Sequence, residues 1–183
     1  MKKLFALVIL FTAFATQHVH AQKIVPYDTV KKQIIYTEVV QVPNTDKGKL
    51  FDRAIRTLDV IYNEASKKMD TKDRDGGNLM MKCTTRVMLM DPKTKMLVAD
   101  KDFIKYKLSI SFKDGKYKYD FYDFHIDKGY KYTLEKMMDE NPAAWKANRT
   151  QEKLEYLDKD IKANIEKLKE GLKSDKVVTK EDW

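Results

Sequence analysis

The sequence has very little cysteine and histidine, which excludes several kinds of site. Cys83 is the only cysteine among 183 residues, so the chain forms no internal disulfide and builds no thiolate metal cluster. Two of the three histidines, His18 and His20, lie near the N-terminus, which leaves only His125 for the rest of the chain. A zinc site made of histidine and cysteine is therefore not expected, and the sequence predicts no cofactor or metal.

Arginine is also scarce, although the formal net charge is +8. Only five of the 36 basic residues are arginines, whereas phosphate recognition favours the two-pronged guanidinium group. The chain also lacks a basic helix, an arginine cluster and an RNA-binding motif with interleaved aromatic residues. We interpret the lysines as a solvated surface and expect no nucleic-acid partner.

Long apolar runs are missing, but a short one lies close to the N-terminus. Residues 4–15 are apolar and follow Lys2 and Lys3. This order is typical of a cleavable export signal, and the run is too short to span a bilayer. Val19 and Ala21 provide the small side chains that cleavage requires, so we predict cleavage after Ala21. No cysteine near this point is available to accept a lipid.

The exported chain would comprise residues 22–183, which is 162 residues. Its formal charge would be +6, because two lysines are removed with the signal. That length suits one domain with a substantial core. We expect residues 22–32 to be an N-terminal extension and no transmembrane segment to follow the signal. A periplasmic location and an extracellular one are both compatible with this prediction.

Residue patterns predict a strand followed by a helix. Residues 33–42 are rich in β-branched and aromatic residues and stop at Pro43, which favours a strand. Asn44 and Thr45 then offer capping groups to a helix. Its apolar residues have the spacing of one helical face and are Leu50, Phe51, Ala54, Ile55, Leu58, Ile61, Tyr62 and Ala65.

The middle of the chain predicts a loop and then a strand. Residues 66–78 are polar and contain Asp75-Gly76-Gly77 near their end, which indicates a loop. Residues 79–90 alternate as a strand, and the side that carries Cys83 is expected to face the core.

The Asp114-Gly115 pair lies between two alternating runs and predicts a hairpin with a two-residue turn. One face of this hairpin would be core, with the pairs Phe112–Tyr117, Ile110–Tyr119 and Leu108–Phe121. The other face would pair Ser111 with Lys118, Ser109 with Asp120, Lys107 with Tyr122, and Lys105 with Phe124.

The C-terminal part is predicted to contain a connection, a long helix and a loose tail over residues 175–183. Residues 128–149 have no clean period and indicate an irregular connection with one helical turn. Residues 150–174 predict a helix that Thr150 caps. Its narrow apolar stripe would dock on its own sheet or on a partner, and consists of Leu154, Leu157, Ile161, Ile165, Leu168 and Leu172.

Three segments carry a resemblance to a known family: Tyr36-Thr-Glu-Val-Val-Gln-Val42, Lys49-Leu-Phe-Asp-Arg-Ala54 and Phe112-Lys-Asp-Gly-Lys-Tyr-Lys-Tyr119. Residues 33–127 resemble a domain of unknown function with a TATA-binding-protein-like fold, found in exported proteins of Bacteroidota. The resemblance implies an α+β fold in which a curved antiparallel sheet of about four strands packs against helices. It implies no catalytic residues, and likeness to a DNA-binding fold is analogy alone.

Four residues form the candidate ligand-binding site: Lys105, Lys107, Tyr122 and Phe124. The aromatic rings would stack on a sugar, peptide or base while the ammonium groups contact polar substituents. The alternative is that the C-terminal helix simply covers these aromatic side chains.

Two other groups of residues are weaker candidates. Asp123 and His125 lie two apart on one strand, as an acid–base pair would, but no nucleophile accompanies them. Asp70, Asp73 and Asp75 are interleaved with basic residues and lack EF-hand spacing, so a solvated loop is expected rather than a calcium site.

The sequence therefore favours a non-enzymatic secreted or periplasmic module that binds a peptide, glycan or partner protein. The main alternative is a structural or assembly protein of the envelope that uses the C-terminal helix as an interaction seam. A hydrolase that works through Asp123 and His125 is the third candidate. A monomer or weak homodimer is expected.

Overall fold

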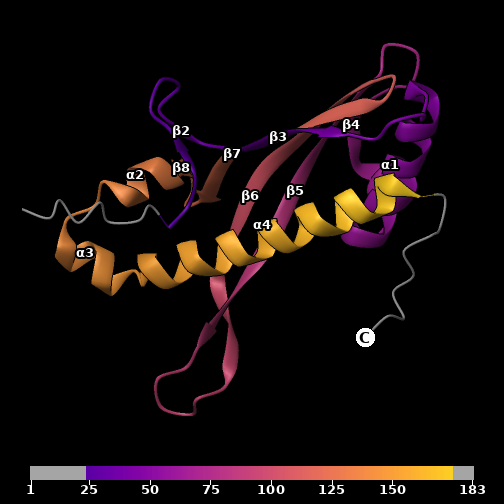
Figure 1. The fold of residues 1–183 in the computed structure, drawn as a ribbon. Coiled ribbons are helices and arrows are strands. Elements are labelled where there is room, and N and C mark those ends of the chain that lie inside the picture. Colours follow the sequence, from indigo (N-terminus) through magenta and orange to yellow (C-terminus); the bar gives the residue numbers. More distant parts are fainter. Residues whose placement is uncertain (1–23, 175–183) are drawn as a thin grey trace, which may run out of the picture.

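The structure is a computed structural model, and it describes residues 24–174 (Figure 1). The predicted export signal over residues 1–21, with its cleavage after Ala21, lies outside the described residues. So does the tail over residues 175–183.

A six-stranded antiparallel sheet forms the centre of the fold, which confirms the predicted α+β class. Its main path runs β3-β7-β6-β5-β4, and β8 also pairs with β7. The strands are β3 (Tyr36–Gln41), β4 (Met69–Asp73), β5 (Asn78–Met90), β6 (Leu97–Lys113), β7 (Lys116–Asp127) and β8 (Lys131–Thr133). A separate two-stranded ribbon joins β1 (Tyr27–Asp28) to β2 (Gln33–Ile34). The expected number of about four strands was too low, because β4 and β8 lie in segments without a strand pattern.

The helices connect and cover the sheet. They are α1 (Lys47–Tyr62), the 3-10 turn η1 (Ala65–Lys68), α2 (Leu134–Met138), α3 (Pro142–Ala147) and α4 (Thr150–Lys173). Asp46 caps α1 by accepting a hydrogen bond from the Lys49 backbone N–H, a role that the sequence had assigned to Asn44 and Thr45. The predicted irregular connection over residues 128–149 contains β8, α2 and α3.

The hairpin of β6 and β7 has the predicted two-residue turn. Gly115 adopts a φ of 74°, which a side chain would disfavour, and the strands pair in the predicted register from Lys113 to Lys107. The turn also holds the start of α1, because the Asp114 carboxylate accepts a hydrogen bond from the Lys47 N–H at 2.8 Å. The hairpin therefore positions both the sheet and the first helix.

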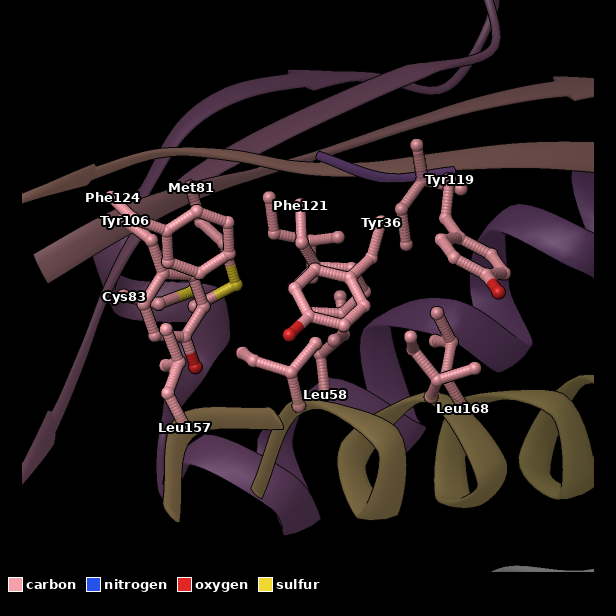
Figure 2. Packing of buried hydrophobic residues seen from close by; sticks show 14 of the residues in the cluster. Tyr36, Leu58, Met81, Cys83, Tyr106, Tyr119, Phe121, Phe124, Leu157 and Leu168 are labelled. Carbon is pink, nitrogen blue, oxygen red and sulfur yellow. The ribbon is translucent and has the colours of Figure 1, made fainter. Parts of the chain in front are cut away.

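Helices α1 and α4 pack on the same face of the sheet (Figure 1). All six residues of the predicted α4 stripe are buried, so the stripe is occupied by the protein's own core. Figure 2 shows Leu157 and Leu168 of α4 beneath aromatic side chains from the strands, including Tyr106 and Phe121. Side chains that lie between the buried ones on the long strands point to the opposite face, and they are exposed or half-buried.

Candidate functional site

The sheet face opposite α1 and α4 is called the open face here, because no helix of residues 24–174 covers its centre. Its central side chains project from the three longest strands and are exposed or half-buried. They are Met80, Lys82 and Thr84 of β5, Lys105, Lys107 and Ser109 of β6, and Lys118, Asp120 and Tyr122 of β7.

Three of the four predicted site residues lie together on the open face. Tyr122 is directly opposite Lys107, as the register predicted, and Lys105 follows on the same side of β6. Tyr122 is half-buried and its hydroxyl donates to the Met80 sulfur at 3.7 Å. Helix α4 does not cover Tyr122, because this helix lies against the other face.

Phe124 does not join this group, and its predicted pairing with Lys105 was wrong. The strand partner of Lys105 is His125, because the register between β6 and β7 shifts between Lys105 and Lys107. Asp123 adopts a φ of 62° at this shift. The extra residue of such a bulge reverses the alternation of the strand.

The bulge directs the Phe124 ring into the core under the helices (Figure 2). The ring is fully buried, stacks on Tyr106 at 5.3 Å between centroids, and meets the edge of Tyr36 at 5.8 Å. Phe124 therefore stabilises the fold and cannot contact a ligand on the open face.

Ion pairs surround Tyr122 on the open face. The Asp123 carboxylate binds Lys107 Nζ at 3.0 Å and also binds Lys131, while Lys105 binds Asp127. Burial raises the pKa of the Asp123 carboxyl, but the hydrogen bonds from Lys131 and Lys107 outweigh it and hold this pKa below its ordinary value. Two carboxylates thus serve three lysines, and the surface around the ring offers both donors and acceptors.

Asp123 and His125 do not form an acid–base pair. His125 Nδ1 lies 2.8 Å from the backbone oxygen of Asp123, while the carboxylate of Asp123 is held by the two lysines. The carboxylate is thus not available to orient the ring, as hydrolytic catalysis would require.

The acidic run before β5 is used for local structure. Asp70 pairs with Lys82 at 3.4 Å, and Asp73 accepts a hydrogen bond from the Gly76 N–H at 2.7 Å. Within residues 24–174, no group of three or more histidine, cysteine or acidic side chains could hold a metal ion.

Two hollows lie next to the edge strand β3, one on each face of the sheet, and neither was predicted from the sequence. One has a volume of about 250 Å³, lies on the open face, and is lined by Val39, Ser111, Lys113, Lys116, Tyr117 and Lys118. The other, of about 680 Å³, lies between β3 and α4. The lysines beside the Asp114-Gly115 turn were visible in the sequence, but the position of β3 at the sheet edge depends on long-range pairing.

The far ends of β5 and β6 extend beyond β7 as a two-stranded arm (Figure 1). The arm exposes large apolar side chains, among them Met90, Met96, Leu97 and Phe103, and Arg86 lies 5.4 Å above the Phe103 ring. This apolar surface was not predicted from the sequence.

This fold defines an α+β protein with one covered and one open sheet face. The chain belongs to the family described as a domain of unknown function (DUF4468) with TBP-like fold, whose pattern matches residues 36–127 and thus half of the chain. The predicted family is therefore confirmed. In residues 24–174, no helix combines the length and apolar character needed to cross a membrane.

Two solved structures share the fold. A TBP-like protein from Parabacteroides distasonis matches with a TM-score of 0.63 at 15% identity, over 83% of this chain and 99% of that one. A DUF4468 family protein from Bacteroides ovatus matches with a TM-score of 0.63 at 12% identity, over 86% of this chain and 95% of that one. No curated protein matches the sequence.

Proposed function

We propose that the protein is an exported, non-enzymatic binding module that holds a glycan on its open face, around Tyr122. The observation that carries this proposal is a half-buried tyrosine on an uncovered sheet face, beside the Lys107–Asp123 and Lys105–Asp127 ion pairs. A sheet surface with an aromatic ring near its centre suits recognition without chemistry.

The chemistry around Tyr122 favours a sugar over a strongly charged ligand. The apolar face of a sugar ring can pack on an aromatic ring such as that of Tyr122. Sugar hydroxyl groups donate and accept hydrogen bonds, and the paired ammonium and carboxylate groups offer both partners. Asp123 and Asp127 offset most of the positive charge of Lys105, Lys107 and Lys131, so the site is less suited to a strongly charged anion.

A glycan array probed with the fluorescent mature protein tests this proposal. We expect binding to a subset of glycans, and we expect Tyr122→Ala to abolish it because the stacking surface is removed. Tyr130→Ala is the matched control, since Tyr130 is an exposed tyrosine in the turn between β7 and β8. Loss of binding in both variants, or in neither, would overturn the assignment to Tyr122.

Export is tested separately by the mass of the protein recovered from cells. We expect the purified protein to lack residues 1–21 and to be recovered from the periplasm or medium, because the N-terminal pattern is that of a cleavable signal. A full-length chain found only in the cytoplasm would contradict this part of the proposal.

The alternative of an assembly role through the α4 stripe has less support. Residues Leu154, Leu157 and Leu168 are buried against the protein's own sheet, so a partner could reach them only if α4 detached. Any assembly role would need another apolar surface, such as the arm of β5 and β6.

A further inference from the structure

We propose that the free edge of β3 binds an extended peptide of alternating acidic and apolar residues from another protein, which adds a strand to the sheet. This site is distinct from the surface around Tyr122, and the two proposals are tested by independent experiments. It uses the backbone of β3 rather than the open face for its main contacts.

The backbone of β3 presents unpaired groups at this edge. Within residues 24–174, strand β3 ends the main path of the sheet and pairs only with β7. Val42 N–H donates to the Gly115 oxygen at 2.8 Å, which makes Val42 a hydrogen-bonded partner of the hairpin. Because hydrogen bonding alternates along an antiparallel strand, the N–H and C=O groups of Thr37, Val39 and Gln41 are directed away from β7.

A hollow lies next to β3 on each face of the sheet, on the side of β3 that faces β7. The open-face hollow contains Val39, and the hollow on the helix side is bounded by Tyr36, Tyr119 and Ile165. Successive side chains of a strand point to opposite faces, so long side chains of a bound peptide would extend across β3 toward the two hollows in turn. Main-chain bonds then supply affinity and the hollows supply specificity.

The two hollows differ in charge, and this defines the peptide. Lys113, Lys116 and Lys118 line the open-face hollow. Lys118 is paired with Asp120 at 2.9 Å, which leaves Lys113 and Lys116 as its cations without a carboxylate partner among the described residues. On the helix side the walls are largely apolar, and Lys169 is already paired with Glu38 at 2.7 Å. Acidic side chains therefore fit the first hollow and apolar side chains fit the second.

A second copy of this chain is a poorer occupant of the edge. Lys116 and Lys118 of β7 lie one strand inside the edge, so pairing two β3 edges would join two sheet faces that carry the same positive charge. An acidic strand has the opposite effect, because it neutralises them.

The test is a titration of the ¹⁵N-labelled mature protein with an acetylated, amidated eight-residue peptide that alternates glutamate and valine. We expect amide shifts centred on Thr37, Val39 and Gln41, and no comparable binding of the peptide that alternates lysine and valine. Two N-methylated versions of the acidic peptide provide the sharpest comparison. One carries methyl groups on its glutamate nitrogens and the other on its valine nitrogens.

Only one set of peptide N–H groups can face β3, so one methylated version should bind at least about tenfold more weakly and the other should bind normally. On the protein side, Val39→Pro removes a single outward N–H and should weaken binding similarly, whereas Val39→Ala retains it. Proline is tolerated at an edge whose N–H faces solvent, and the methylated peptides require no variant at all.

Three outcomes would overturn the proposal. The first is absence of binding at millimolar peptide. The second is equal behaviour of the two methylated versions, which would indicate simple electrostatic capture by the lysines. The third is a protein that forms dimers through β3, because the edge would then already be occupied.

Discussion

Gly171 of α4 lies directly against Thr57 of α1. A Cβ atom built on Gly171 would lie 2.1 Å from Thr57 Oγ1, which leaves no space for a side chain. The same helix crossing carries a hydrogen bond from Arg53 Nη1 to the Leu172 backbone oxygen at 3.1 Å, and Thr57 Oγ1 donates to the Arg53 oxygen at 2.8 Å. This close approach positions α4 over the sheet and so determines which face is covered.

The first prediction concerns this crossing. Gly171→Ala should destabilise the protein by about 1–3 kcal/mol, because a methyl group is forced into a filled space. Helix propensity alone would favour alanine by about 1 kcal/mol, so the sign of the change is informative. Urea unfolding measures it.

Gly48→Ala is the matched control for this substitution. Its added Cβ would meet only the end of the flexible Arg74 side chain, at 2.9 Å, so the variant should be neutral or slightly stabilised. Equal effects of the two substitutions would show that α1 and α4 do not approach each other as described.

The second prediction concerns Lys153, a buried lysine that joins α4 to β6. Its Nζ atom lies 2.7 Å from Asp102 and 3.3 Å from Asp100. Lys153→Met should cost about 3–5 kcal/mol, because two largely buried carboxylates lose their partner. Lys159→Met, at an exposed site on the same helix, should change the free energy of unfolding by less than about 0.5 kcal/mol. Thermal unfolding measures both variants. Similar unfolding midpoints of the two would contradict the ion pair.

The third prediction concerns pH. Burial raises the pKa of the Asp160 carboxyl above its ordinary value of 3.8, although a hydrogen bond from Thr85 opposes this. The folded state therefore binds a proton more tightly than the unfolded state. The resulting contribution to the free energy of unfolding is complete below the ordinary pKa of Asp160. It is lost as the pH rises through the raised pKa of the folded state.

Asp160→Asn should not lose stability in this way as the pH rises, because asparagine stays neutral. We expect the variant to be more stable than wild type at pH 7 and to match it more closely at pH 3.5, as measured by urea unfolding at both pH values. Glu170→Gln, at an exposed position of α4, is the control for removing a negative charge. A stability difference that does not change with pH would contradict the raised pKa.

The sequence correctly predicted those elements that depend only on residues near one another in the chain. The apolar stripe from Leu154 to Leu172 and the Asp114-Gly115 turn both depend on spacing within one segment, and both are confirmed. The bulge at Asp123 could not be predicted in this way. Aspartate tolerates a positive φ but does not require it, so alternation was carried past this residue and Phe124 was assigned to the wrong face.

The site was predicted only in part for a related reason. Lys105, Lys107 and Tyr122 come together because the hairpin register is set by its own turn. The hollows beside β3 depend instead on pairing between β3 and β7, which are far apart in the sequence. The short polar strand β4 similarly forms because it pairs with its neighbour β5, and its own residues do not show a strand pattern.

The central claim is that helices cover one face of the sheet and leave the other open. Mass spectrometry after brief exposure of the native Tyr122→Cys variant to N-ethylmaleimide tests it most directly. Cys83 is an internal reference on the covered face, because it is buried and burial raises its pKa to about 12. We predict one rapid adduct in the variant and none in the wild-type protein. A variant thiol as unreactive as Cys83, or a wild-type Cys83 that reacts as fast as the new thiol, would contradict the claim.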